Sequence, residues 1–402
     1  MAAAPDTQTA KPLDAFREEA RGWLEANFPK ALEGKENAYA TIDAPAQASP
    51  DSSAWKQAMA DRGWGVPTWP AEYGGGSLSR AEAKVLAEEM ARIGAWNPIG
   101  GMGVMMFGPT LLEYGSEEQK RRHIPSIARG EIRWCQGYSE PGAGSDLAAL
   151  QTRAEDKGGH FLVNGQKTWT SGGQWADWCF ALVRTDSTRK HEGISFLLID
   201  MKSPGVDVRP IRLISGSSPF CETFFTDVEV PKENLVGPLN GGWTIGKRLL
   251  QHERTNLSGG GRLAAALGRS LVDIAKHYVG TDGEGRIADP DLRQRIIRYE
   301  MEMRAFTMTA RRVMEEAKGG GVSTASSILK NVGAKLTQER AELTIEIMGM
   351  NGLGWEGDMF SEGELSATRG WLWGKAVTIY GGSTEIQNNV VAKRILGMLD
   401  HQ

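Results

Sequence analysis

The stretch YSEPGAGSDLAAL, at residues 138–150, divides a helix-like part of the chain from a strand-like part. Gly142 and Gly144 allow the backbone to approach a ligand closely, while Ser139 and Ser145 offer hydroxyl and N–H groups. From these residues alone, two readings stay open. The stretch is either a generic polar Gly-Ser turn or a cradle for a phosphate or a heterocycle.

The residue pattern changes on both sides of this stretch. Residues 1–133 are mostly helix-like, with apolar residues such as Phe16 and Ala20 at helical spacing. Residues 134–240 contain short β-rich runs between turn residues, which predict antiparallel strands. Residues 241–402 contain long periodic helices. We therefore expect an α+β fold with an N-terminal α-helical domain, a middle antiparallel β domain and a C-terminal four-helix bundle.

The composition excludes several classes of protein. A formal net charge of −4 over 402 residues argues against a nucleic-acid binder. No apolar run is long enough to cross a bilayer, and the N-terminus lacks the features of a signal peptide, so we expect a cytoplasmic protein without membrane insertion. Three scattered cysteines and six scattered histidines show no metal-ligand spacing, which predicts no metal site.

Three strings together resemble the signatures of the acyl-CoA dehydrogenase flavoproteins. YSEPGAGSDLAAL is similar to the first signature of that family. GQKTWTSGG (165–173) resembles the strand whose tryptophan covers the flavin, and TIYGGSTEIQNNVVAKRILG (378–397) resembles the C-terminal signature. The resemblance implies FAD held between the middle sheet and the C-terminal bundle. It also implies an acyl-CoA substrate, an electron-transfer flavoprotein as acceptor, and a tetramer.

The resemblance also implies roles for individual residues. Trp169 would stack on the isoalloxazine ring, with Thr170 and Ser171 near its N5 edge, whereas without the flanking match Trp169 would be read as a core aromatic. Ser145 would also face the thioester arm of the substrate, and Gly382 would lie near the substrate. The remaining flavin contacts would come from Gln136, Tyr138, Ser139, Gly144, Ser145, Ser383, Thr384 and Glu385.

The catalytic base does not occupy its commonest position. The family removes an α proton with a carboxylate while the β hydrogen leaves as hydride, and many members carry this Glu directly after the Tyr of the C-terminal loop. Here Tyr380 is followed by Gly381. The isovaleryl- and long-chain types carry the Glu on the first long C-terminal helix, directly before an Arg, which matches Glu253 and Arg254. Arg254 resembles a residue near the substrate, and its alternative is an ordinary ion pair.

Helical spacing supports Glu253 independently of the resemblance. Ile245, Leu249, Glu253 and Leu257 recur every four residues, which places Glu253 on an apolar, inward face. Burial would raise its pKa towards the range useful for a base, although a structural Glu–Arg pair is the alternative. The N–H of Gly381 would then bind the thioester oxygen, and its missing side chain would leave room for a branched or bulky acyl group.

Two positions depart from the family pattern at the ADP end of FAD. The segment HYVGTDGEGR (277–286) lacks the usual Arg and Phe, with Arg286 shifted, and Glu346 replaces a Gln. We therefore expect FAD to be held differently, more weakly, or with the help of an unlike subunit in a heterotetramer. A non-catalytic partner subunit and a flavin monooxygenase using His252 are the competing functions.

Overall fold

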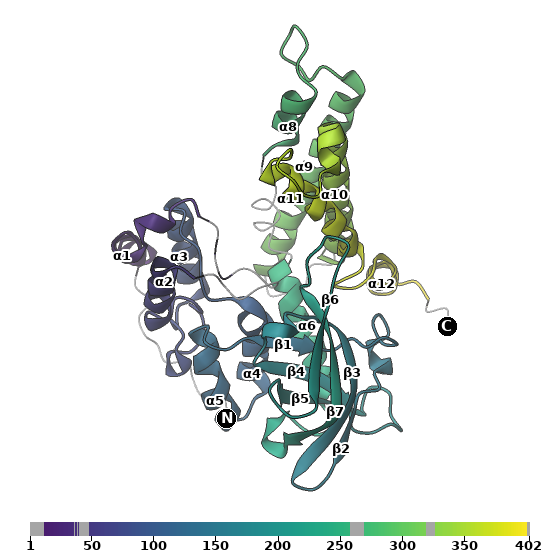
Figure 1. The fold of residues 1–402 in the computed structure, drawn as a ribbon. Helices are drawn as coiled ribbons and strands as arrows, with labels where there is room; N and C mark the ends of the chain where they lie inside the picture. Colours follow the sequence, from purple (N-terminus) through teal and green to yellow (C-terminus); the bar gives the residue numbers. More distant parts are fainter. Residues whose placement is uncertain are drawn as a thin grey trace. The chain divides into compact units, whose positions relative to one another are not determined.

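A computed structural model describes residues 12–35, 37, 39, 48–257, 269–318 and 326–399, without the side chains of 253–257, 317, 318, 326, 327 and 394 (Figure 1). The described chain forms two compact units. The first holds the residues up to Ile211 together with Ser218–His252. The second holds Arg212–Ser217 and the residues from Glu253 onward.

The first unit begins with helices that bury one side each. In the first helix Phe16, Ala20 and Leu24 are buried, as their spacing predicts. Two later helices begin with a capping box, at Ser79 and at Ser116, which satisfies N–H groups of the first turn. The helices of this part are α1 (Leu13–Asn27), α2 (Pro50–Asp61), α3 (Arg80–Arg92), α4 (Gly108–Tyr114) and α5 (Glu117–Ala128).

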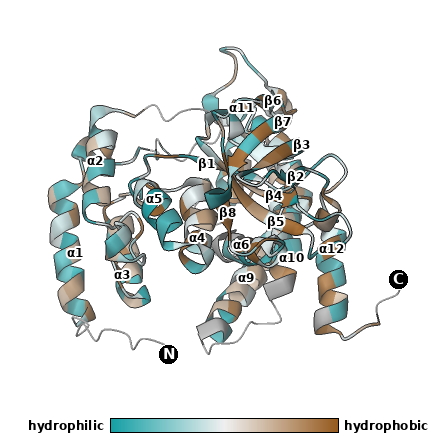
Figure 2. Cartoon of the chain, turned by 90° about the horizontal axis from the view of Figure 1, so that it is seen from below, coloured by the Kyte–Doolittle hydropathy of each residue, from teal (hydrophilic) through white to brown (hydrophobic). Residues whose placement is uncertain are grey.

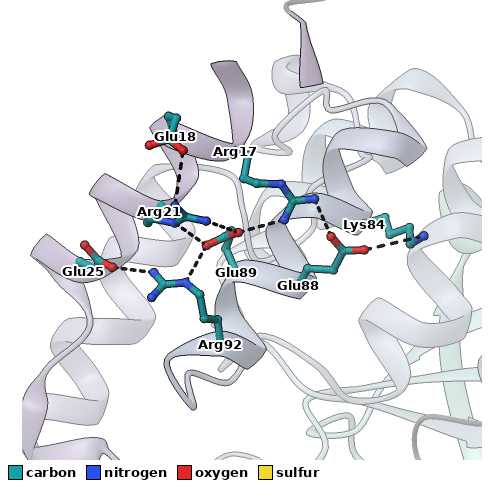
Figure 3. Close-up of polar contacts among 8 residues, drawn as sticks. All are labelled: Arg17, Glu18, Arg21, Glu25, Lys84, Glu88, Glu89 and Arg92. Atoms are coloured by element: carbon teal, nitrogen blue, oxygen red, sulfur yellow. Dashed lines mark hydrogen bonds and ion pairs between the residues drawn. The ribbon is translucent and has the colours of Figure 1, made fainter. Parts of the chain in front are cut away.

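Charged residues join α1 to α3. The Glu89 side chain of α3 is 3% exposed and binds Arg17 and Arg21 of α1 as well as Arg92 (Figure 3). Because three guanidinium groups surround it, this carboxylate is fully paired despite its burial.

An eight-stranded sheet follows, in the order β6-β7-β3-β2-β4-β5-β8, with β1 beside β4. Its strands are β1 (Trp134–Gly137), β2 (Arg153–Asp156), β3 (His160–Ser171), β4 (Trp178–Arg184), β5 (Ile194–Asp200), β6 (Val206–Ile211), β7 (Phe220–Pro231) and β8 (Leu235–Val236). The sheet is mainly antiparallel, as predicted, but β1 runs parallel to β4 and β2 meets β4 in parallel at one residue pair. The long loop between β1 and β2 and the β3 strand provide the crossover that a parallel pair needs.

Both faces of the sheet are covered with apolar side chains, and Figure 2 shows β5 in hydrophobic colours. On one face Phe107, at the start of α4, stacks on Phe180 of β4 at 5.4 Å. Ile245 and Leu249 of α6 (Gly242–Leu257) are buried in the same core. The inward face predicted for this helix is therefore confirmed up to Leu249.

The second unit is helical, as predicted. Leu336 and Leu343 of one long helix form a core with Ile296 and Tyr299 of another. Its helices are α8 (Leu271–Tyr278), α9 (Pro290–Lys318), α10 (Ser326–Met348), α11 (Glu362–Trp373) and α12 (Thr384–Val390). The boundary between the compact units falls after His252, whereas the sequence predicted domain boundaries at 133/134 and 240/241. These three domains stay a prediction.

Candidate functional site

The loop 138–152, between β1 and β2, brings several predicted site residues to the surface of the first unit. Gly144 and Ser145 are exposed, and a Cβ atom at Gly144 would meet no heavy atom within 4 Å. Glu140 and Ala143 exchange two backbone hydrogen bonds of 3.0 Å, which close the turn. The loop therefore offers a fixed backbone with open space beside its glycine.

Buried charges hold the base of this loop. Lys167 of β3 is completely buried, and its Nζ donates to Glu140 Oε1 at 2.7 Å and to the Tyr138 carbonyl at 3.1 Å. Glu140 in turn accepts the backbone N–H groups of Gln151 (2.6 Å) and Thr152 (2.9 Å). Burial acts to raise the pKa of Glu140, but the charge and hydrogen bond of Lys167, together with the hydrogen bonds from Thr152 and Gln151, outweigh it and lower that pKa.

A second buried cation binds the same loop from β4. Arg184 donates to the carbonyl of Ala148 at 2.6 Å and to that of Leu150 at 3.3 Å. It also binds the carbonyls of Arg189 and Lys190, at 2.8 and 2.7 Å. The end of β4 therefore ties the loop to the neighbouring turn.

Trp169 lies near the end of β3 with its side chain largely free. It is 54% exposed, its φ is +59°, and its ring meets Phe220 edge-on at 5.9 Å. A non-glycine residue with positive φ is uncommon, and here it accompanies a break in the β3–β7 register. An exposed indole on a rigid strand suits stacking on a planar ring, and it does not fit a core aromatic.

The predicted site residues next to Trp169 and at the end of β1 differ in how far their side chains are buried. Thr170 is completely buried and accepts a hydrogen bond from the Thr223 hydroxyl, so a cofactor contact would need its backbone. Ser171 and Gln136 are half-buried. The ring of Tyr138 packs edge-on against Phe180 and Phe196 in the core, and Ser139 accepts the N–H of Thr168 through its carbonyl.

In the second unit, the loop before α12 is held through its carbonyl groups. Gly381 and Gly382 have φ angles of +68° and +94°. Gln387, which is buried, donates to the Gly381 carbonyl at 3.0 Å, and Lys330 of α10 donates to the Gly382 carbonyl at 2.6 Å. Gly381 is exposed, and a Cβ atom there would meet no heavy atom within 4 Å.

The residues that follow cap α12. Ser383 is the N-cap, and its hydroxyl accepts the N–H of Ile386 at 3.4 Å. Thr384 is half-buried and Glu385 is exposed in the first turn. Three polar residues, Ser383, Thr384 and Glu385, therefore follow the glycine pair Gly381–Gly382 in the sequence.

Three sequence predictions concern α6. Its backbone extends through Glu253 and Arg254, but both side chains lie outside the described residues. His252 packs beside α4, with its Nε2 3.9 Å from Glu113 Oε2. Burial, followed by the charge of Arg248, lowers the pKa of His252.

Arg286 and Glu346, which depart from the family pattern in the sequence, are ion-paired within the second unit. Arg286 donates to Asp282 at 2.9 Å and pairs with Glu284 at 2.7 Å. Glu346 forms a bidentate pair with Arg295. Both side chains are thus engaged with neighbours on their own chain.

Comparison with known proteins identifies the family. The models of the N-terminal, middle and C-terminal domains of acyl-CoA dehydrogenases match residues 11–131, 135–228 and 240–396. "Acyl-CoA dehydrogenase IpdE1" of Mycolicibacterium smegmatis is 36% identical over 401 residues, covering 96% of this chain and 98% of its own. This chain belongs to the acyl-CoA dehydrogenase family.

Solved structures of acyl-CoA dehydrogenases share its fold. The Tcur3481-Tcur3483 steroid ACAD is 28% identical with a TM-score of 0.77, covering 98% of this chain and 99% of its own. A chain of the ChsE4-ChsE5 complex from Mycobacterium tuberculosis is 28% identical with a TM-score of 0.75, and the match covers 100% of this chain and 100% of the matched chain.

Acyl-CoA dehydrogenases use FAD to oxidise an acyl-CoA thioester, and the sheet residues of this chain fit that cofactor. Trp169 presents an exposed aromatic face, and Ser145 is an exposed polar residue beside Gly144, which has open space around it. Among the described residues, no three His, Cys, Asp or Glu side chains gather as a metal site would require. No described helix has both the length and the apolar composition needed to span a membrane.

Sequence reasoning missed the residues that support the acyl-CoA dehydrogenase loops. Lys167, Glu140 and Arg184 hold the first loop, while Lys330 and Gln387 hold the second. The available signal was a lysine that continues the alternation of the buried Phe161 and Val163 in β3, and an arginine that ends the apolar strand β4, because such side chains are rarely buried without partners. For Lys330, which lies on a helix of mixed polarity, no comparable signal exists.

Proposed function

We propose that this acyl-CoA dehydrogenase acts on a bulky acyl group and uses Glu253 as its base. The open space at Gly381 carries the proposal, because the commonest position of the base there holds no side chain. The relatedness to the steroid ACAD structure supports a polycyclic acyl group.

The position of Glu253 on α6 supports its role. The preceding residues of the same helical face, Ile245 and Leu249, are buried, so the face leads inward to the turn that contains Glu253. A carboxylate at such a place would be desolvated and could accept the α proton of the substrate. Arg254, next to it, would contact the substrate.

The loop before α12 would bind the thioester. With the carbonyls of Gly381 and Gly382 already bonded to Gln387 and Lys330, the N–H of Gly381 is the group that would meet the thioester oxygen. That donor would stabilise the negative charge that develops on the oxygen as the α proton leaves. Bound FAD supplies the acceptor for the β hydride.

On the cofactor, Trp169 would cover one face of the ring, and the backbones of Thr170 and Ser171 would lie near its edge. The further residues proposed to contact the cofactor are Gln136, Tyr138, Ser139, Gly144, Ser145, Ser383, Thr384 and Glu385. An electron-transfer flavoprotein would reoxidise it.

Glu253→Gln tests the mechanism. With a panel of acyl-CoAs added anaerobically, we expect flavin bleaching to slow by about 10²–10⁴-fold, the usual contribution of a general base, while acyl-CoA binding persists. Glu300→Gln, an exposed carboxylate on α9, is the matched control and should leave the rate unchanged. Unchanged bleaching in Glu253→Gln removes this residue from the mechanism.

A heteromeric assembly is the second candidate, and the ion pairs at the ADP end favour it. Arg286 is tied to Asp282 and Glu346 to Arg295, so neither is a free side chain that could reach a neighbouring FAD. The ChsE4-ChsE5 complex shows that a similar chain assembles with an unlike subunit. Mass measurement and FAD content of the chain purified alone and with a co-expressed family member distinguish the two: a homotetramer with one FAD per chain removes this candidate.

A further inference from the structure

The polar network beneath the loop 138–152 has no place in the mechanism above. Lys167 and Glu140 are 27 residues apart in sequence, yet they meet at 2.7 Å inside the sheet domain. Neither contacts solvent to a useful extent, since Lys167 is 0% and Glu140 7% exposed. A buried ion pair is weak evidence for stability, because desolvation offsets much of its attraction, so its position calls for another explanation.

Each polar atom of the pair binds a part of the loop. Lys167 Nζ reaches the Tyr138 carbonyl, at the start of the loop, and Glu140 binds the N–H groups of Gln151 and Thr152, at its end. The pair therefore joins both ends of the loop at one point. Gly144 and Ser145, which would contact the flavin, project from the part between these ends.

The same lysine also lies on the strand that carries Trp169. Only Thr168 separates the two residues, and the N–H of Thr168 donates to the Ser139 carbonyl at 2.9 Å. Because the Lys167 side chain is bonded to the loop, it holds the loop in a fixed position relative to the strand segment that carries the Trp169 indole.

We propose that Lys167 and Glu140 are a positioning pair, which holds the loop 138–152 in register with Trp169 and so sets how tightly FAD is retained. This inference rests on the proposed flavin contacts of Ser145 and Trp169, and Lys167 and Glu140 are not among those proposed contacts. The pair acts through the loop: when either charge is removed, the other remains buried without its partner and the two loop ends separate.

The test uses the full chain purified with its FAD. Lys167→Met and Glu140→Gln are compared with Lys202→Met, which removes an exposed lysine that pairs with Asp177 at 3.2 Å in the same domain. After dilution, the rise of free-flavin fluorescence measures FAD release. We expect release at least about tenfold faster in both single variants and unchanged in the control.

Hydrogen exchange separates positioning from general loss of structure. Peptides covering 138–152 should exchange faster in the two single variants, while peptides from β4 and β5 keep their protection. The double variant Lys167→Met/Glu140→Gln leaves no unpaired charge, so it should recover thermal stability yet still release FAD quickly. Release within twofold of the unaltered protein in the double variant, or unchanged exchange of 138–152 in the single variants, overturns the proposal.

The exchange measurement also separates this inference from the proposed function. If the unaltered chain carried no FAD, the flavin contacts would fail, and exchange of the loop would still decide whether the pair positions it. If the unaltered chain retained FAD and the variants released it at the same rate, only the positioning role would fall.

Discussion

Lys330 of α10 donates a 2.6 Å hydrogen bond to the carbonyl of Gly382, 52 residues further along the chain. The bond fixes the peptide between Gly382 and Ser383, one residue beyond Gly381, whose N–H is the proposed donor to the thioester oxygen. Burial lowers the pKa of Lys330 and the charge of Glu385 opposes that shift. The lysine thus holds the loop in place from a helix that is distant from it in the sequence.

Lys330→Met should therefore impair catalysis without removing a catalytic group. We expect kcat/KM for acyl-CoA to fall by about 10–100-fold, because a small displacement of a positioned donor is costly in the transition state. Lys335→Met, on the same helix and paired with the exposed side of α9 through Glu302, is the control. A variant with wild-type kcat/KM would show that the loop does not depend on this bond.

Gly381→Ala should lower the midpoint of thermal unfolding through backbone strain. With φ at +68° and no atom within 4 Å of the new Cβ, the expected cost is about 1–2 kcal/mol and comes from conformation alone. Gly370→Ala gives the opposite sign, since this exposed glycine lies within α11, also with open space, and alanine should stabilise the helix by about 1 kcal/mol. Equal effects of the two substitutions would contradict the left-handed conformation of Gly381.

Glu89→Gln should weaken the attachment of α1 to α3. The loss of a buried carboxylate that binds Arg17, Arg21 and Arg92 should cost about 2–3 kcal/mol of unfolding free energy in urea. Hydrogen bonds from Arg21 and then Arg92 lower the pKa of Glu89 to about 2, from 4.5. Because the folded pKa is depressed, this stability is present above pH 4.5 and is lost as the pH falls towards 2.

The neighbouring Glu88 is the control for Glu89. Its side chain is 43% exposed and binds only at the surface, to Arg17 and Lys84, so Glu88→Gln should cost less than about 1 kcal/mol. If both substitutions lower the unfolding free energy by the same amount, the burial of Glu89 contributes nothing to the attachment of α1 to α3.

His123→Phe should flatten the pH dependence of stability between pH 6.5 and 4. The ring lies edge-on to Trp134 and Trp178, its Nε2 finds no partner among the described residues, and burial lowers its pKa from 6.5 to about 4. The unfolded chain therefore binds the proton first on acidification, and the folded state loses about 2–3 kcal/mol across this window.

Phenylalanine keeps the ring and cannot be protonated, so the variant should resist acid better than the unaltered protein in that range. Unfolding free energies measured in urea at pH 7, 5.5 and 4 check this, with His160→Phe, at the partly exposed first residue of β3, as the matched control. An unchanged slope in His123→Phe assigns the acid sensitivity to other groups.

Contiguous motifs account for much of what could be predicted. YSEPGAGSDLAAL and the C-terminal string predicted the family, and the family comparison confirmed it together with the helix–sheet–helix order. Apolar periodicity correctly predicted the buried face of α1 and that of α6 up to Leu249, because a helix repeats its environment every three to four residues. The parallel β1–β4 pair was not predictable in this way, since strand composition does not record the direction of a partner.

The sequence by itself determined which residues are small, polar or aromatic at the site, and therefore the family and its chemistry. Only the tertiary structure decided which side chains hold these site residues in place. Lys167 reaches Glu140 across the sheet, and Lys330 reaches Gly382 from another helix, because long cationic side chains buried by folding must find acceptors wherever the chain brings them. Tertiary packing also left Trp169 exposed rather than in the core, since the break in register and its positive φ turn it away from the sheet's interior.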